Sequence, residues 1–310
     1  MPQTLRTQSE TDANLHADRS TVPLPVSDAT GAGRRCGGPS SNLIVMPVSS
    51  APQPSPASDP FARFRLDDRI VLITGTTSGI GVRFARVLHA AGAKVVMAAR
   101  RLDRLESLAA ELPGSIAIQA DVSRPEECTG LVDEVLARLG RIDVLINNAG
   151  TVAYAAPEDE TYEEWRRVMA LNLDGAFLLA QRCAKAWMIP NGGVIVNVAS
   201  MLGHVSSGQM TQASYAASKG ALVNLTRELA CLWARKGIRV NALCPGFFDS
   251  ELTNDLIEDA GGAKWLRSKT PMGRIGVEGE LDGALLYLCS DASSYVTGQS
   301  LIVDGGWTAA

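Results

Sequence analysis

The chain has 310 residues, of which 46% are apolar and 20% are charged, and its formal net charge is −4. This composition is typical of a globular protein with one large domain or two ordinary ones. The slightly acidic balance argues against a nucleic-acid-binding protein, which would normally carry a basic excess. No apolar run approaches the ~18 residues of a transmembrane helix, so we expect no membrane insertion.

The first sixty residues differ in composition from the rest of the chain. They hold nine of the 15 prolines and contain no Phe, Tyr, Trp or Lys. Such a segment buries too little apolar surface to offset the entropy lost on ordering, so residues 1–60 are predicted to be a disordered extension. The apolar stretch Leu43–Met46 is too short for a secretory signal, and several acids argue against a transit peptide. We therefore expect a cytoplasmic protein, with Met46 as an alternative initiator and residues 61–310 as a single folded domain.

The cysteines are scattered and show no paired C-x2-C spacing. They are Cys36, Cys128, Cys183, Cys231, Cys244 and Cys289. This distribution predicts reduced, structural side chains and no metal site.

From residue 69 onwards, short β-branched and apolar runs alternate with segments of helical periodicity. Strands are predicted at Ile70–Thr74, Lys94–Ala98, Ser115–Ala120, Ile142–Asn147, Val194–Ala199, Ile238–Leu243 and Leu301–Val303. Helices are predicted at Ile80–Ala91, Asp103–Leu112, Glu126–Leu139, Tyr162–Ala186, Ser214–Lys236 and Gly279–Ser290. The pattern predicts an α/β fold with a single Rossmann-type, doubly wound parallel sheet of about seven strands, flanked by helices. Ligands of such a sheet bind at the carboxyl ends of its strands.

A glycine-rich segment, Thr74–Gly81, joins the first predicted strand to the first predicted helix. Glycines let the backbone approach a pyrophosphate closely, and a helix N-terminus offers free N–H groups. The spacing G-x3-G-x-G differs from the usual G-x-G-x-x-G fingerprint, but the position between strand and helix still predicts a dinucleotide cofactor. The expected contacts are Gly75, Thr77, Ser78, Gly79, Ile80 and Gly81.

The end of the second predicted strand indicates which cofactor is preferred. An acid there usually binds the ribose hydroxyls of NAD, whereas an arginine accommodates the 2′-phosphate of NADP. Here Ala99 is followed by Arg100 and Arg101, and the first acid is Asp103. We expect NADP(H) to be preferred and NAD to be the alternative, with Arg100 as the better candidate. The other interpretation is that both arginines only solvate the start of a helix.

Five motifs in the folded part resemble those of the short-chain dehydrogenase/reductase (SDR) family, in the family's order. They are the Thr74–Gly81 loop, Asp121, the N-N-A-G sequence at Asn147–Gly150, the Y-x3-K sequence at Tyr215–Lys219, and Pro245–Gly246. The resemblance extends over about residues 66–308. It implies further cofactor contacts from Asp121, Val122, Asn148, Ala149, Gly150, Tyr215, Lys219, Pro245 and Gly246.

Tyr215 and Lys219 are four residues apart and therefore share one face of a helix. Hydride transfer to a ketone leaves an alkoxide that must be protonated, and the reverse reaction needs a base. A free tyrosine has a pKa of ~10, so it needs a nearby positive charge to act near neutrality, which Lys219 would supply. The resemblance implies that Lys219 also binds the nicotinamide ribose.

Ser200 ends the fifth predicted strand, where a hydroxyl would polarise a substrate carbonyl. It precedes Tyr215 by 15 positions, against about 13 in the family, so Ser206 and Ser207 are alternatives. We favour Ser200 because only this serine lies at the strand end. Asn172 matches the family asparagine that holds a proton-relay water to the lysine. The predicted catalytic residues are Asn172, Ser200, Tyr215 and Lys219.

The segment after Gly246 corresponds to the substrate loop of the family. The apolar contacts expected there are Phe247, Phe248 and Leu252, beside Ser200 and Tyr215; Ser250 or Thr253 matches a hydroxyl that touches the carboxamide. Residues 247–263 carry five acids and no base, which disfavours acyl-carrier or coenzyme A thioesters. A solvated helix face explains these acids equally well. For His204 we expect a structural role.

We predict an NADP(H)-dependent enzyme that interconverts a secondary alcohol, or a sugar or polyol hydroxyl, and a ketone, with Tyr215 as general acid/base. One alternative is a 3-oxoacyl-thioester (acyl-carrier protein) reductase. Another is a non-catalytic NADP-sensing regulator, although such proteins usually lose the Tyr or the Lys. The resemblance also implies a homo-oligomer, a tetramer or dimer, that packs through residues 162–186 and 214–236. The expected partner is a small molecule, with no nucleic acid, no membrane and no metal.

Overall fold

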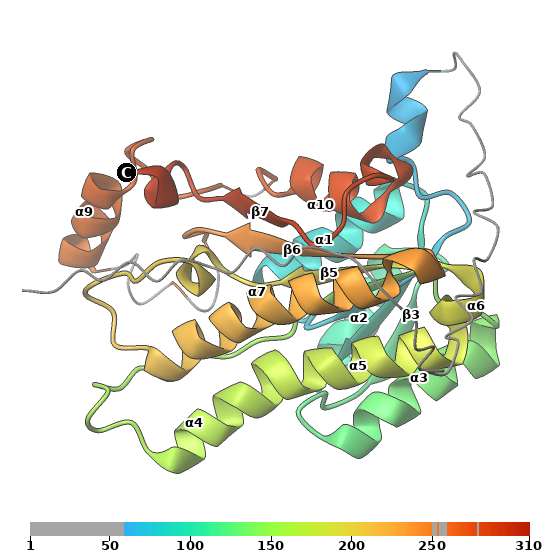
Figure 1. The fold of residues 1–310 in the computed structure, drawn as a ribbon, viewed down its shortest axis with the longest axis horizontal. Helices are drawn as coiled ribbons and strands as arrows, with labels where there is room; N and C mark the ends of the chain where they lie inside the picture. The colour runs from blue at the N-terminus through green and yellow to red at the C-terminus, as the bar shows by residue number, and fades with distance from the viewer. Residues whose placement is uncertain (1–58, 250–252, 254–258, 278) are drawn as a thin grey trace, which may run out of the picture. The chain divides into compact units, whose positions relative to one another are not determined.

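Seven parallel strands form the centre of the structure, in the order β3-β2-β1-β4-β5-β6-β7 (Figure 1). They are β1 (Ile70–Thr74), β2 (Lys94–Ala99), β3 (Ile116–Gln119), β4 (Val144–Asn147), β5 (Gly193–Val198), β6 (Ile238–Pro245) and β7 (Ser300–Val303). All seven predicted strands are present, and the doubly wound sheet is confirmed. The strand order reverses between β1 and β4, and such a reversal opens a crevice at the carboxyl ends of the strands.

The computed structural model describes residues 59–249, 253, 259–277 and 279–310. These residues belong to one compact unit. The disorder predicted for residues 1–58 falls outside the described residues, as does Leu252. Asp59 and Pro60 had been assigned to the extension, but they begin the 3-10 helix η1 (Pro60–Phe64), where the Asp59 carboxylate accepts the N–H of Phe61 at 2.9 Å.

Helices cover both faces of the sheet. The α-helices are α1 (Gly79–Ala90), α2 (Leu102–Glu111), α3 (Pro125–Leu139), α4 (Tyr162–Met169), α5 (Gly175–Cys183), α6 (Ile189–Asn191), α7 (Ala213–Trp233), α9 (Ala260–Lys269) and α10 (Asp282–Cys289). Figure 1 shows α7, α5, α4 and α3 on one side of the sheet and α1 and α10 on the other.

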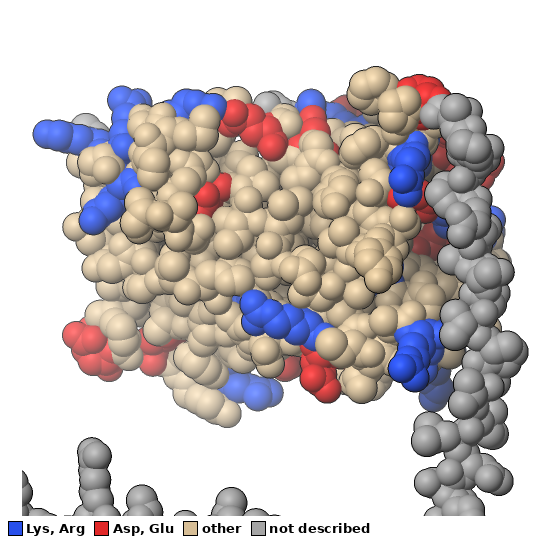
Figure 2. Space-filling model, turned by 45° about the horizontal axis from the view of Figure 1, so that its top comes forward, with Lys and Arg blue, Asp and Glu red and all other residues tan. Residues whose placement is uncertain are grey.

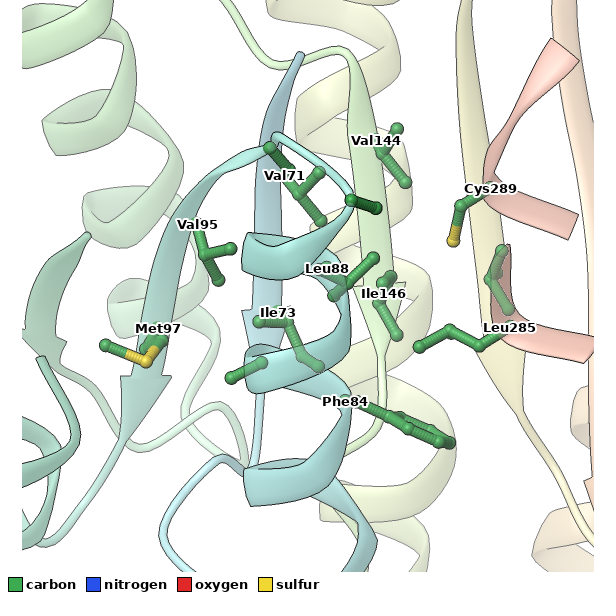
Figure 3. Packing of buried hydrophobic residues seen from close by; sticks show 14 of the residues in the cluster. Val71, Ile73, Phe84, Leu88, Val95, Met97, Val144, Ile146, Leu285 and Cys289 are labelled. Carbon is green, nitrogen blue, oxygen red and sulfur yellow. The ribbon is translucent and has the colours of Figure 1, made fainter. Parts of the chain in front are cut away.

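The alternation of side chains along β1 explains this two-sided cover. Val71 and Ile73 pack with residues of α1, α2 and α10, whereas Ile70 and Leu72 pack with residues of α3, α5 and α7. Figure 3 shows the first of these cores, in which Phe84 of α1 and neighbouring apolar side chains fill the space beside the strands. Because helices bury both faces of the sheet, we expect the ligand-binding polar residues at the ends of its strands.

The helix predicted over Tyr162–Ala186 is interrupted by two π-helical turns, η2 (Ala170–Asp174) and η3 (Ala184–Met188). In the first turn, the N–H of Gly175 donates to the carbonyl of Ala170, five residues earlier. Each such turn inserts one extra residue into a helix, and π-turns are frequent at functional sites. The single predicted helix is therefore a chain of α and π segments.

A chain of buried amides joins the two central strands to the helices beside them. Asn147 of β4 lies opposite Asn197 of β5, and the Asn147 amide donates to the Asn197 side-chain oxygen at 2.9 Å and to the carbonyl of Ala176 at 3.1 Å. The Asn197 amide donates to the Thr226 hydroxyl at 2.9 Å, which donates to the carbonyl of Leu222 at 2.8 Å. These bonds fix α7 against β5.

Replacing Thr226 by valine keeps the shape of the side chain but removes the hydroxyl that accepts the hydrogen bond from the Asn197 amide. We expect Thr226→Val to lower the free energy of unfolding by about 1–3 kcal/mol, because the Asn197 amide is left buried without a partner. Urea denaturation measures the change. Thr129→Val is the matched control, since Thr129 also donates to a carbonyl four residues earlier but is exposed on α3. Equal effects of both substitutions would contradict the role of the buried chain.

Candidate active site

A cleft of about 420 Å³ lies at the carboxyl ends of the central strands, on the side where the strand order reverses. All the predicted cofactor and substrate contacts line it except Leu252, which is not described. Three of the four predicted catalytic residues, Ser200, Tyr215 and Lys219, also line it, whereas Asn172 lies behind its wall. The structure thus brings together residues from distant parts of the sequence, from Gly75 to Thr253.

The glycine-rich loop turns tightly between β1 and α1. Gly75 has φ = +72°, and a Cβ atom on it would lie 2.7 Å from the Cα of Ala149. A Cβ on Gly81 would lie 2.1 Å from the carbonyl oxygen of Gly75, so α1 packs directly on the loop. Only glycine fits at these two positions. Because Gly75 and Gly81 have no side chains, the amino end of α1 can lie at the cleft.

The residues around this loop fit a dinucleotide. The Asn148 amide nitrogen donates to the carbonyls of Thr74 and Gly75, at 2.9 and 3.0 Å. Its amide oxygen and the hydroxyl of Thr76 are buried without a hydrogen-bond partner among the described residues, and the side chain of Ser78 does not cap α1. Unsatisfied buried groups beside a helix N-terminus are what a bound phosphate or amide would complete.

The two arginines after β2 have different surroundings. Arg101 donates to the hydroxyl of Thr77, at 3.0 and 3.1 Å, and to its carbonyl at 3.2 Å, so it braces the glycine-rich loop. The guanidinium of Arg100 makes no hydrogen bond with any described residue and is exposed at the cleft. On the other side, Asp121 accepts the backbone N–H and the hydroxyl of Ser123, at 3.1 and 2.7 Å.

Ser200, Tyr215 and Lys219 converge at the other end of the cleft. Ser200 is buried two residues after β5, its hydroxyl accepts the N–H of Leu202 at 3.1 Å, and it is close enough to the Tyr215 phenol to lower the pKa of that phenol. The Lys219 ammonium donates to the carbonyl of Val198 at 2.7 Å and lies 5.6 Å from the centre of the Tyr215 ring. Ser200 is therefore the serine that meets Tyr215.

The alternative serines, Ser206 and Ser207, lie outside the cleft lining. Their hydroxyls accept the backbone N–H groups of Gly208 and Met210, each at 3.1 Å, and so stabilise their own turn. His204 also lies outside the lining, with Nε2 3.6 Å from the sulfur of Cys244.

Burial shifts the pKa values of Tyr215 and Lys219 in opposite directions. It raises the pKa of Tyr215 to about 12, against a smaller lowering by the hydrogen bond with Ser200. It lowers the pKa of Lys219 to about 8. The lowering of the Tyr215 pKa that we expect from the Lys219 ammonium, 5.6 Å from the ring centre, does not outweigh the effect of burial. The protein alone therefore holds Tyr215 as a neutral phenol, ready to donate a proton.

Asn172 occupies the π-turn η2 and connects the loop after β4 to α7. Its side-chain oxygen accepts the N–H of Thr151 at 2.8 Å, and its amide donates to the carbonyl of Thr151 and the hydroxyl of Ser218, at 2.9 and 3.0 Å. A Cβ on Gly150 would lie 3.5 Å from both the Asn172 oxygen and the Lys219 nitrogen. The side chain of Asn172 thus positions the segment beside Lys219, and its role in a proton relay stays a prediction.

The apolar wall of the cleft is an aromatic cluster that the sequence did not predict. Phe247 lines the cleft and packs against Trp265 and Trp307, with ring centres 6.2 and 5.2 Å away. Phe248 also lines the cleft, but its ring lies against Gly276, where a Cβ would approach it to 2.2 Å. Phe248 therefore mainly supports the loop. The hydroxyl of Thr253 donates to the carbonyl of Phe248 at 2.6 Å.

Three further residues line the substrate end and were missed in the sequence: Tyr154, Met210 and Gln212. Tyr154 follows the N-N-A-G motif by four positions, and Gln212 precedes Tyr215 by three, or about one helical turn. Their positions next to recognised motifs were the available signal. The backbone bond from Ala155 to Thr211, 3.2 Å long, holds the two segments together.

Comparison with known proteins agrees with this geometry. The family model described as Enoyl-(Acyl carrier protein) reductase matches residues 75–308. Galactitol 2-dehydrogenase (L-tagatose-forming) of Cereibacter sphaeroides is 39% identical over 247 residues, which cover 79% of this chain and 97% of that protein. The chain belongs to the short-chain dehydrogenase/reductase family.

Solved structures of SDR proteins superpose on most of this chain. The crystal structure of a gluconate 5-dehydrogenase from Burkholderia cenocepacia, in complex with NADP and tartrate, is 40% identical, with a TM-score of 0.77, and covers 81% of this chain and 100% of that one. The NADPH-dependent 3-quinuclidinone reductase from Rhodotorula rubra is 30% identical, with a TM-score of 0.78, and covers 86% and 100%. This SDR is an NAD(P)-dependent oxidoreductase that acts on CH–OH groups.

The described part of the SDR chain offers neither a membrane span nor a cluster of metal ligands. No helix there is long and apolar enough to cross a bilayer. No three His, Cys, Asp or Glu side chains in the same residues gather in a way that could hold a metal ion. The five described cysteines are unpaired, four of them buried, whereas Cys231 is exposed.

The burial of Lys219 predicts a stability that depends on pH. A lysine whose pKa falls from 10.5 to about 8 on folding opposes folding below pH 8, and the cost disappears as the pH rises towards 10.5. At about 1.4 kcal/mol per pKa unit the full cost is on the order of 3 kcal/mol. Lys219→Met should therefore stabilise the cofactor-free protein by roughly 1–3 kcal/mol at pH 7, after loss of the bond to Val198.

That gain should shrink by about 2 kcal/mol at pH 9.5, where the wild-type side chain is largely neutral. Urea denaturation at both pH values measures it. Lys236→Met, at an exposed position after α7, is the control and should show no such change. A pH-independent effect of Lys219→Met would contradict the buried ammonium.

Proposed function

We propose that this SDR interconverts a secondary alcohol of the sugar or polyol class and the corresponding ketone, with NADP(H) as the preferred cofactor and Tyr215 as the general acid/base. The observation that carries the proposal is the meeting of the Tyr215 phenol, the Ser200 hydroxyl and the Lys219 ammonium at one end of the cleft. The catalytic roles follow from the chemistry of these groups.

In the reducing direction, the substrate carbonyl oxygen would accept hydrogen bonds from Ser200 and Tyr215. The nicotinamide, when bound, supplies hydride to the carbonyl carbon. Tyr215 gives its phenolic proton to the oxygen, which becomes the hydroxyl of the product. Lys219 stabilises the phenolate that remains, because a positive charge favours the anionic form. In the oxidising direction the phenolate form of Tyr215 would take the hydroxyl proton, and the hydride would pass from the carbon to the oxidised cofactor.

The glycine-rich loop and Asn148 would hold the pyrophosphate end of the cofactor, and Asp121 the adenine end. Support for NADP over NAD comes from Arg100, whose exposed guanidinium lies at the cleft where a 2′-phosphate would lie. The gluconate 5-dehydrogenase structure was solved in complex with NADP. Arg101 contributes indirectly, because it is bound to Thr77.

The sugar or polyol class is supported by the relatives, which include galactitol 2-dehydrogenase and gluconate 5-dehydrogenase. The alternative of a 3-oxoacyl-thioester reductase has a specific basis in the family model, whose description names an acyl carrier protein. We favour the carbohydrate class because the relatives at 39% identity are named for it. Activity with a ketose and with a 3-oxoacyl thioester separates the two.

We also propose a cytoplasmic homo-oligomer, a tetramer or dimer. Large apolar side chains are exposed on the helices that would pack, among them Phe177 of α5 and Leu232 of α7. Strand β7 is at one edge of the sheet, and its residues are only partly buried. Figure 2 shows charged side chains mostly along the edges of one face, with a broad uncharged area between them. Uncharged surface of this kind is suited to subunit contacts.

Tyr215→Phe should abolish turnover in both directions, because the phenylalanine ring fills the same space but carries no proton. NADPH binding, followed by fluorescence titration, should remain close to that of the wild type. Tyr295→Phe is the matched control at a fully exposed tyrosine and should keep full activity. Turnover by Tyr215→Phe at more than a small fraction of the wild-type rate would overturn the mechanism.

Arg100→Ala should lower the ratio of kcat/KM with NADPH to kcat/KM with NADH by about tenfold or more. A charge-assisted hydrogen bond to the 2′-phosphate contributes roughly 1.5–3 kcal/mol, and only NADPH carries that group. Arg138→Ala removes an exposed arginine of α3 that bonds to Glu134, and it should leave the ratio unchanged. An Arg100→Ala enzyme with the wild-type ratio would show that this arginine does not read the phosphate.

A further inference from the structure

Gln212 has a buried polar side chain in the wall of the cleft. The mechanism proposed above gives this side chain no role. Only 7% of it is exposed, and it lines the same cleft as Ser200 and Tyr215. Its amide nitrogen contacts the sulfur of Met210 at 3.8 Å, a weak acceptor, and its oxygen accepts no hydrogen bond from any described residue. The amide can therefore make further hydrogen bonds on the cleft side.

The usual structural role for a polar residue at this position is absent. Gln212 is the residue before α7, where a side chain often caps the first N–H groups of the helix, but its side chain makes no such bond. The N–H of Ser214 instead donates to the carboxylate of Glu160 at 3.2 Å. Because Glu160 takes over the cap, the amide of Gln212 remains available to the cleft.

The surroundings of Gln212 connect it to the end of the cleft that holds Tyr215. Gln212 is the residue before α7, three positions from Tyr215, and both side chains line the same cleft. The backbone bond between Ala155 and Thr211 brings the segment of Tyr154 against it, and Tyr154 also lines the cleft. The opposite wall near Tyr215 is apolar, formed by Phe247 and the tryptophans behind it.

We propose that Gln212 determines substrate specificity by binding a hydroxyl on the carbon next to the reacting carbonyl. The proposal rests on the proposed function and names the substrate class more narrowly as α-hydroxyketones and vicinal diols. A primary amide both donates and accepts, and so does an alcohol hydroxyl, so the two complete each other's hydrogen bonds. The amide carries no charge, so it fits a neutral hydroxyl better than a carboxylate. A ketone without the hydroxyl lacks this hydrogen bond to Gln212 and is therefore bound more weakly in the transition state.

The test compares kcat/KM for three ketones reduced with NADPH: 3-hydroxybutan-2-one, its isomer 4-hydroxybutan-2-one, and butan-2-one. The wild-type enzyme should favour the first over the other two. In Gln212→Leu, which keeps the bulk and removes the amide, the ratio of 3-hydroxybutan-2-one to butan-2-one should fall by about tenfold or more, whereas the ratio of the other two changes little. Gln209→Leu is the matched control, an exposed glutamine of the same loop outside the cleft, and should leave all ratios unchanged.

Thermal unfolding and NADPH titration of Gln212→Leu report whether the fold and the cofactor site are intact. An unchanged ratio in a folded, NADPH-binding variant overturns the role of Gln212, as does an equal fall for all three ketones. If the wild-type enzyme reduces none of these ketones and no ketose, the proposed function itself fails. A wild-type enzyme that reduces ketoses without preferring the 3-hydroxy ketone overturns only the role of Gln212.

Discussion

The hydrogen bond from the Lys219 ammonium to the carbonyl of Val198 is the interaction around which the site is built. It connects α7 to the last residue of β5, and it does so with a charged group that is only 4% exposed. A charge in that position opposes folding, so the surrounding structure must hold it in place. The amide chain from Asn147 through Asn197 to Thr226 does this from one side, and the Asn172 amide, bonded to Ser218, does it from the other.

The cofactor end and the substrate end of the cleft have different origins in the fold. Apart from Tyr215 and Lys219 of α7, the residues that would contact the cofactor lie after the ends of parallel strands or in the first turn of α1, where the sheet dictates their positions. The substrate end is formed by segments outside the sheet, namely the loop after β4, the turn before α7 and the aromatic cluster with Trp265 and Trp307. Substitution in these segments can change the substrate without disturbing the strands that hold the cofactor.

The strands and the glycine-rich loop could be predicted because local sequence determines them. Buried parallel strands are continuous apolar runs, and Gly75 and Gly81 lie where the backbone requires glycine. Ser200 could be chosen over its neighbours because the strand end fixed its place. The raised pKa of Tyr215 could not be predicted, since it comes from the burial of the phenol in the folded cleft. The proposed role of Gln212 could not be predicted either. Its side chain is not used as a helix cap because the N–H of Ser214 donates to Glu160, which lies 54 positions earlier in the sequence.

The π-turn that contains Asn172 has a geometric consequence for the helix that follows it. One α-helical residue corresponds to a rotation of about 100° around the helix axis. If the same residues were wound as a regular α-helix without the π-turn, every later side chain would be turned by that angle. Leu179 and Cys183, which now face the sheet core, would then point away from it. The π-turn takes up one residue. One helix can therefore present Asn172 to the cleft wall and its apolar side to the sheet.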